Sequence, residues 1–278
     1  EWTPQILDIR KANHVPATFF IIGSNAEANP DLVKRIVDDG FEVGSHTFTH
    51  PNLSDTPEEA IPLEMNATQR LFQALTGRSL RLFRPPYLGD AEPTDEDQIA
   101  PVETAQDMGY ITVGEHVDPI DWALPGVDEI VKRTLQQVHS AKPSMPRNIV
   151  LFHDAGGDRE ETVEALPIVI AKLKAEGYAF VPVSKLAGLT RDQAMPPLSP
   201  TLALLTDRVV FLAVSKVGHF LYYCFLAAIF LGIARSLMIG VLGVWNARQE
   251  RKQDAMPPLG EPLQVSVIIP AYNEENVI

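Results

Sequence analysis

The sequence predicts an α/β domain built around a parallel sheet or β/α barrel, followed by a membrane-spanning helix. Three observations lead to this prediction. Over about the first 190 residues, short apolar runs alternate with longer segments of helical periodicity. Polar clusters follow several of these runs, as they do where the loops after successive barrel strands share one site. Further along, an apolar stretch is long enough to cross a bilayer.

Each strand and helix follows from a local signal. The expected strands are the apolar runs at residues 17–22, 42–45, 82–83, 111–113, 149–152 and 179–182. The expected helices are residues 30–39, 56–75, 127–140 and 160–176. Thr56 and Pro57, with the acidic residues after them, form the N-cap and first-turn pattern of the second helix. Gly40, Gly77 and Gly177 lie just beyond three of the helices, where glycine commonly ends a helix.

His46 and His50 follow the expected strand at residues 42–45 and lie four positions apart. If the loop makes one helical turn, this spacing brings both rings to the same face. Neutral imidazole suits zinc and its neighbours among the transition metals, so the pair is a candidate for binding a divalent cation. Histidines at this spacing also occur as ordinary surface or core residues, and the pair alone leaves both interpretations open.

Three more polar clusters lie where an apolar run gives way to a loop. They are Arg84-Pro85-Pro86-Tyr87, Asp118-Pro119-Ile120-Asp121-Trp122 and Leu151-Phe152-His153-Asp154. A hydrolytic metal site collects ligands, a base, an acid and an oxyanion donor from several strand ends. Taken singly, each cluster is equally well a turn, a core aromatic or a strand end.

The four motifs in this order resemble the polysaccharide deacetylases, also known as carbohydrate esterase family 4 or NodB-like proteins. The motifs are His-Thr-x-x-His-Pro, Arg-Pro-Pro-Tyr, Asp-x-x-Asp-Trp and Leu-x-His-Asp, and the resemblance covers residues 1 to about 190. It implies a distorted (β/α) barrel of the polysaccharide deacetylase type. It also implies metal-dependent hydrolysis of N-acetyl groups on a polysaccharide that contains N-acetylglucosamine.

The resemblance also implies a role for each motif residue. His46 and His50 would bind the divalent metal, which we expect to be zinc. His153 would be the general acid that protonates the leaving amine, and Asp121 would pair with it and favour its protonated form. Arg84 would orient a catalytic aspartate through its fixed, always-charged guanidinium group.

The remaining motif residues would surround the substrate. The backbone N–H of Tyr87 would help to hold the oxyanion that forms when water attacks the acetyl carbonyl. Trp122 and Leu151 would form the walls of a small pocket for the acetyl methyl group.

One element of the family pattern is not in this sequence. The family begins with Thr-Phe-Asp-Asp-Gly-Pro, in which one aspartate is the catalytic base and the other is the third metal ligand. This sequence opens at Glu1-Trp2-Thr3-Pro4, so we expect a barrel whose first strand is missing by truncation. The alternative is a catalytically inactive carbohydrate-binding domain that serves a membrane glycosyltransferase.

The charge is unevenly distributed. Residues 1–207 hold 17 Lys and Arg against 31 Asp and Glu, a net −14, whereas residues 208–278 hold 6 against 5, a net +1. An acidic domain argues against nucleic-acid binding, which requires a basic face. Cys224 is the only cysteine, so no disulfide forms within the chain.

After residue 190 the sequence changes character. We expect a proline-rich linker at residues 191–208, a transmembrane segment at residues 209–246 and a cytoplasmic linker at residues 247–262. Residues 217–234 contain no Asp, Glu, Lys or Arg. Arg248, Arg251 and Lys252 follow the apolar stretch, and the positive-inside rule places them in the cytoplasm. The chain would then lie in the cell membrane lipid bilayer, with residues 1–190 extracytoplasmic and its C-terminus cytoplasmic.

The final residues, 263–278, carry a second resemblance. A β-branched run that ends in Pro270-Ala271-Tyr272-Asn273-Glu274 is similar to the first strand of family 2 glycosyltransferases, which helps to bind a nucleotide sugar. The rest of that domain would be truncated. This resemblance implies that a deacetylase is fused through a transmembrane segment to a glycosyltransferase.

Overall fold

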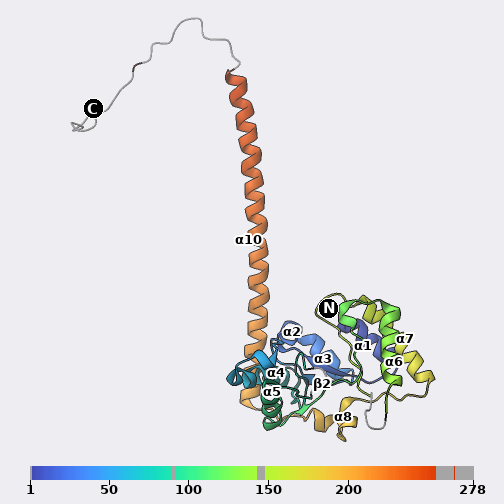
Figure 1. Cartoon of the computed structure of the whole chain (residues 1–278). Coiled ribbons are helices and arrows are strands. Elements are labelled where there is room, and N and C mark those ends of the chain that lie inside the picture. Colours follow the sequence, from blue (N-terminus) through green and yellow to red (C-terminus); the bar gives the residue numbers. More distant parts are fainter. Residues whose placement is uncertain (1, 89–91, 143–147, 255–265, 267–278) are drawn as a thin grey trace. The chain divides into compact units, whose positions relative to one another are not determined.

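The computed structural model describes residues 2–88, 92–142, 148–254 and 266 (Figure 1). The chain divides into two compact units, Glu1–Val217 and Gly218–Ile278. The expected glycosyltransferase strand at residues 263–278 lies, apart from Ser266, outside the described residues.

The first unit is built on a parallel sheet of four strands in the order β1-β2-β3-β4. The strands are β1 (Thr18–Ile21), β2 (Glu42–Ser45), β3 (Leu82–Phe83) and β4 (Ile111–Thr112). Thr18 lies opposite Glu42, and Phe83 lies opposite both Ser45 and Thr112. Because the strands are parallel, the residues after each strand emerge at one edge of the sheet.

Helices connect the strands and cover the sheet (Figure 1). They are α1 (Thr3–Ala12), α2 (Gly23–Ala28), α3 (Pro30–Asp38), α4 (Ile61–Thr76), α5 (Glu96–Asp107), α6 (Val127–His139), α7 (Glu160–Ala175), α8 (Val183–Leu186) and α9 (Arg191–Ala194). Short 3-10 turns span Leu53–Asp55, Glu58–Ala60 and Asp121–Ala123. The expected helices at residues 30–39, 127–140 and 160–176 are confirmed to within one residue at each end.

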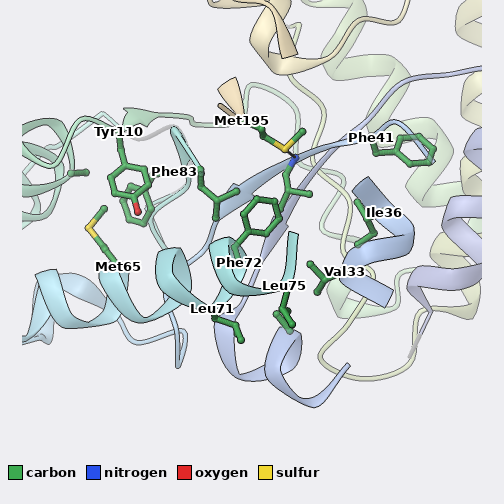
Figure 2. Close-up of a cluster of buried hydrophobic side chains, with 14 of the residues drawn as sticks. Val33, Ile36, Phe41, Met65, Leu71, Phe72, Leu75, Phe83, Tyr110 and Met195 are labelled. Carbon is green, nitrogen blue, oxygen red and sulfur yellow. Dashed lines mark hydrogen bonds between the residues drawn. The ribbon is translucent and has the colours of Figure 1, made fainter. Parts of the chain in front are cut away.

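The main core lies between α4 and the sheet (Figure 2). Helix α4 buries side chains at the three- and four-residue spacing of one helix face, namely Ile61, Met65, Thr68, Phe72 and Leu75. Phe72 and Phe83 are both fully buried, and burying each such side chain stabilises the fold by about 1.5–3 kcal/mol. This core fixes the strand ends of β2 and β3.

A second core joins α6 to α7. It contains Val117, Ile130 and Val169, and the partly buried Val150 and Phe152 pack against it. The two helices therefore support both the loop after β4 and the segment that leads to residue 153.

Two predicted features of the fold are wrong in detail. The helix expected from residue 56 begins at Ile61, after the 3-10 turn Glu58–Ala60, and Pro62 lies in its first turn, where its missing N–H costs no helical hydrogen bond. The runs at residues 149–152 and 179–182 are not strands. Val150 makes only an isolated parallel bridge with Val117. Within the described residues the sheet thus has four strands and does not close into a barrel.

The segment expected to be a linker, residues 191–208, is packed onto the first unit. It contains α9, the fully buried Met195, and Asp207, which forms an ion pair with Arg70 at 2.6 Å. The sulfur of Met195 lies 3.1 Å from the backbone nitrogen of Val43 in the sheet. Residues 191–208 are therefore part of the first unit.

Helix α10 (Leu202–Asp254) is a single helix of 53 residues, continuous through Arg235. It is the one helix, among the residues that the structure describes, with the length and apolar composition to cross a membrane. About 20 residues suffice to span the hydrocarbon core of a bilayer, so α10 exceeds that length.

Candidate active site

His46 and His50 approach each other directly after β2. Their Nε2 atoms lie 3.1 Å apart, and the rings meet edge to face. The Nδ1 atom of His46 lies 2.7 Å from the carbonyl oxygen of Arg84. A carbonyl can only accept a hydrogen bond, so Nδ1 of His46 carries the proton and Nε2 keeps its lone pair.

The loop that carries these histidines is not the expected helical turn. It is a bend with positive φ angles at Thr47 (64°) and His50 (62°). Glu64 of α4 holds the bend, because its Oε2 accepts the backbone N–H groups of Phe48 at 2.9 Å and Thr49 at 2.8 Å. The rings therefore converge through a loop that is anchored to α4.

The surroundings keep both imidazoles neutral. Burial lowers the pKa of His46 to about 3, although its hydrogen bond to Arg84 opposes this, and nearby positive charges lower it further. The pKa of His50 is also lowered, chiefly by burial and then by the charge of His153. Neutral imidazole is the form that binds a metal. The effect of His153 on both groups shows that it lies near them.

The donor set suits zinc. Two nitrogens bound to one tetrahedral zinc ion at about 2.0–2.1 Å are about 3.3 Å apart, close to the observed 3.1 Å. Among the described residues, no three His, Cys, Asp or Glu side chains gather around one point. A metal held by His46 and His50 would therefore need at least one further ligand.

Arg84 follows β3, is almost fully buried, and forms an ion pair with Glu115. The guanidinium expected to orient an aspartate thus pairs with a glutamate that no sequence motif marks. Glu115 lies in the loop after β4 and has no recognisable motif around it. Only the adjacency of β3 and β4 in the sheet brings the two side chains together.

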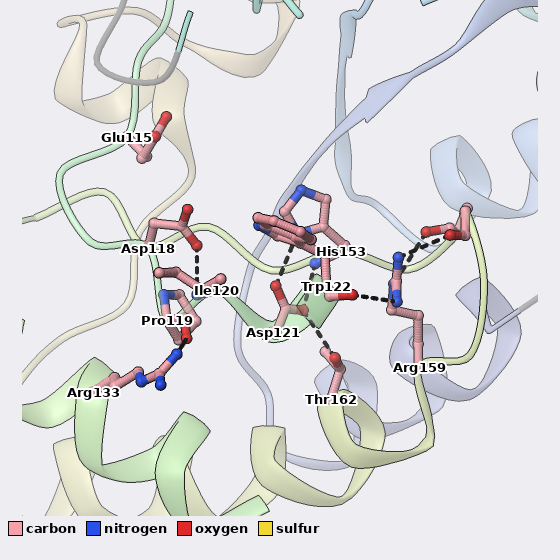
Figure 3. Close-up of polar contacts among 12 residues, drawn as sticks. Glu115, Asp118, Pro119, Ile120, Asp121, Trp122, Arg133, His153, Arg159 and Thr162 are labelled. Carbon is pink, nitrogen blue, oxygen red and sulfur yellow. Dashed lines mark hydrogen bonds and ion pairs between the residues drawn. The ribbon is translucent and has the colours of Figure 1, made fainter. Parts of the chain in front are cut away.

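Asp121 and His153 form a hydrogen-bonded pair (Figure 3). Oδ1 of the fully buried Asp121 lies 2.8 Å from Nδ1 of His153, and Oδ2 accepts the backbone N–H of His153 and the hydroxyl of Thr162. Burial alone would raise the pKa of Asp121, but the hydrogen bonds from His153 and Thr162 outweigh it and lower the pKa. Asp121 is therefore an anion at neutral pH, and the partly exposed His153 has Nε2 left to meet a substrate.

The three residues expected at the substrate differ in exposure. Tyr87 is largely exposed, has a positive φ of 62° and packs its ring edge to face on His50. Trp122 is about half exposed, which leaves its indole available to a ligand. Leu151 is partly buried, and its N–H donates to the carbonyl of Val117 at 2.9 Å.

The chain is similar to several known proteins. Residues 1–112 match the family described as Polysaccharide deacetylase. A peptidoglycan-N-acetylglucosamine deacetylase of Bacillus cereus is 39% identical over 189 residues, which cover 66% of this chain and 81% of that protein. A chitooligosaccharide deacetylase of Bradyrhizobium sp. is 34% identical over 196 residues, which cover 66% and 84% respectively.

Solved structures agree with these similarities. The Bc1960 peptidoglycan N-acetylglucosamine deacetylase matches with a TM-score of 0.61 and 32% identity, over 69% of this chain and 84% of that one. BA3943 of Bacillus anthracis, described as a CE4 family pseudoenzyme, matches with a TM-score of 0.57 and 33% identity, over 66% and 60%.

Proposed function

Because this chain belongs to the polysaccharide deacetylase family, we propose that its first unit hydrolyses N-acetyl groups on a polysaccharide that contains N-acetylglucosamine. The observation that carries the proposal is the Asp121–His153 pair beside two neutral imidazoles, His46 and His50. Relatives described as acting on peptidoglycan N-acetylglucosamine and on chitooligosaccharide support this class of substrate.

We place a divalent metal, with zinc as the expected ion, at His46 and His50. When bound there, it would act as a Lewis acid toward the acetyl carbonyl oxygen. The third ligand and the catalytic base would be the aspartate pair of the family pattern, which residues 1–278 do not contain. In this proposal Arg84, now paired with Glu115, orients that base.

His153 would donate a proton from Nε2 to the amide nitrogen as the carbon–nitrogen bond breaks, so that the sugar leaves as an amine. Asp121 accepts a hydrogen bond from Nδ1, which orients the ring and stabilises its cationic form. Water supplies the oxygen that leaves in acetate. Tyr87 would contribute its backbone N–H to the oxyanion, and Trp122 and Leu151 would enclose the methyl group.

Acetate release from N-acetylglucosamine oligomers tests the proposal, with protein that carries the expected acidic strand ahead of residue 1. We expect release that stops on chelation and returns with zinc. His153→Ala should abolish release without loss of bound metal, whereas His139→Ala, an exposed histidine paired with Glu176, should not affect it. Undiminished release from the His153 variant would remove this residue from the acid role.

A catalytically inactive carbohydrate-binding domain is the second candidate. It is favoured by the two-histidine ligand set among the described residues and by the similarity to BA3943, described as a pseudoenzyme. Oligosaccharide binding without acetate release, in the presence of zinc and the acidic strand, would support this candidate over hydrolysis.

We further propose that α10 crosses the cell membrane, with the first unit outside and the C-terminus in the cytoplasm. The length and hydropathy of α10 and the cations Arg248, Arg251 and Lys252 at its end support this. Residues 263–278 would begin a family 2 glycosyltransferase that uses a nucleotide sugar. The deacetylase would then act on polymer as it emerges outside.

A further inference from the structure

We propose that Thr162 is a positioning residue for the Asp121–His153 pair, and that the first turn of α7 sets the geometry of this pair. The inference rests on the proposed function, because it identifies what holds the general acid in place. Thr162 belongs to none of the motifs that the sequence analysis singled out.

The hydrogen bonds of the Asp121 carboxylate are divided between its two oxygens (Figure 3). Oδ2 accepts the Thr162 hydroxyl at 2.8 Å and the backbone N–H of His153 at 2.9 Å, whereas Oδ1 lies against Nδ1 of His153. Rotation of the carboxylate would break contacts on both oxygens at once. Thr162 thus keeps Oδ2 turned inward, which leaves Oδ1 facing the imidazole.

The N-cap residue of α7 also contacts Trp122, the residue that follows Asp121. Arg159, which directly precedes α7, is buried and donates from Nη1 to the carbonyl of Trp122 at 3.4 Å. Its other hydrogen bonds are to carbonyl oxygens of Ala155, Gly156 and Asp158. Arg159 thereby ties the loop of Asp121 to the loop of His153.

The hydroxyl of Thr162 matters because both it and Asp121 are fully buried. A buried carboxylate stays anionic only where donors replace the lost water. Valine has nearly the same shape as threonine but would place a methyl group against Oδ2. The anion would then be less favoured, and its hydrogen bond to His153 would weaken.

Three variants isolate this hydroxyl. Thr162→Val removes it, and Thr162→Ser keeps it. Thr134→Val is the matched control, because Thr134 is also fully buried, yet its hydroxyl donates at 2.8 Å to Ile130 of its own helix, α6. If valine prevents folding at position 162, Thr162→Ala removes the same hydroxyl without adding bulk at Oδ2.

The primary measurement is the NMR resonance of the His153 Nδ1 proton in the whole chain, labelled with nitrogen-15 at its seven histidines. The missing signal in His153→Gln assigns it. We expect this resonance to move upfield in Thr162→Val and to stay in place in Thr162→Ser and Thr134→Val. An unchanged resonance in Thr162→Val, or an equal shift in Thr134→Val, would overturn the proposal.

An activity measurement then separates this inference from the proposed function. In protein that releases acetate, Thr162→Val should lower kcat about tenfold, the effect of one hydrogen bond to a charged group, and move the acidic limb of the pH profile upward with little change in KM. A loss confined to KM would count against a positioning role. If the resonance shifts as expected and no preparation releases acetate, Thr162 still positions the pair and the hydrolytic function fails.

Discussion

The carbonyl oxygen of Arg84 lies 2.7 Å from Nδ1 of His46, which joins the ends of β2 and β3 at the candidate metal site. This contact fixes the tautomer of His46 and turns the lone pair of Nε2 toward His50. Arg84, the residue expected to orient the catalytic base, therefore also orients the candidate metal ligand His46 through its backbone carbonyl.

We expect the His46 imidazole to stay neutral across the physiological pH range. Its pKa in the folded chain is about 3, below the ordinary value of 6.5. Between these values the unfolded chain binds more protons, so the free energy of unfolding should decrease as pH falls from about 6.5 toward 3. Urea unfolding at several pH values measures this. His46→Gln should flatten the dependence, and an unchanged slope would contradict the assignment.

We expect zinc to bind through both histidines. His50→Gln should weaken zinc binding by about tenfold or more, since even the loss of an outer partner costs 10–100-fold. Isothermal titration of the metal-free chain measures this, with His139→Gln as the control at an exposed histidine. Affinity should also fall in acid, because protons compete for the same nitrogens. Equal affinity in the His50 variant would place the metal elsewhere.

Glu64 should act on the metal site through the loop. Glu64→Ala removes the acceptor for the N–H groups of Phe48 and Thr49, and we expect it to lower the free energy of unfolding by about 2 kcal/mol. It should also weaken zinc binding, because the bend would lose its anchor. Glu59, an exposed residue just before α4, provides the control variant Glu59→Ala. An unchanged zinc affinity in Glu64→Ala would show that the loop keeps its conformation without Glu64.

The direction of the membrane crossing can be read by cysteine labelling. The chain has one cysteine, so Cys224→Ser gives a background without thiols. Into it we would introduce Ser140→Cys in the first unit or Ser266→Cys near the C-terminus, both at exposed positions. An impermeant thiol reagent applied to intact cells should label only the first. Labelling of the Ser266→Cys variant alone would contradict the proposed topology and would place the C-terminus outside the cell.

Local signals were enough to place α3, α6 and α7, whereas α1, α2, α5, α8 and α9 carry no signal that the sequence analysis used. Helices α3 and α7 end within two residues of Gly40 and Gly177, because a glycine stop acts over a few residues. The predicted start of α4 is too early, because the cap pattern of Thr56 and Pro57 precedes a 3-10 turn, Glu58–Ala60, and the α-helix begins only after that turn. The strands predicted at residues 149–152 and 179–182 are wrong, because a strand forms only beside a partner strand and the local sequence does not indicate whether a partner is present.

The sequence by itself determined which residues form the candidate site, because the four ordered motifs contain His46, His50, Arg84, Asp121 and His153. Only the tertiary structure decided what holds these residues in place. Glu64, Glu115 and Thr162 carry no motif, and each meets its partner from a different helix or loop. The physical reason is that a hydrogen bond depends on positions in space, and packing of α4 and α7 against the sheet and α6 sets those positions.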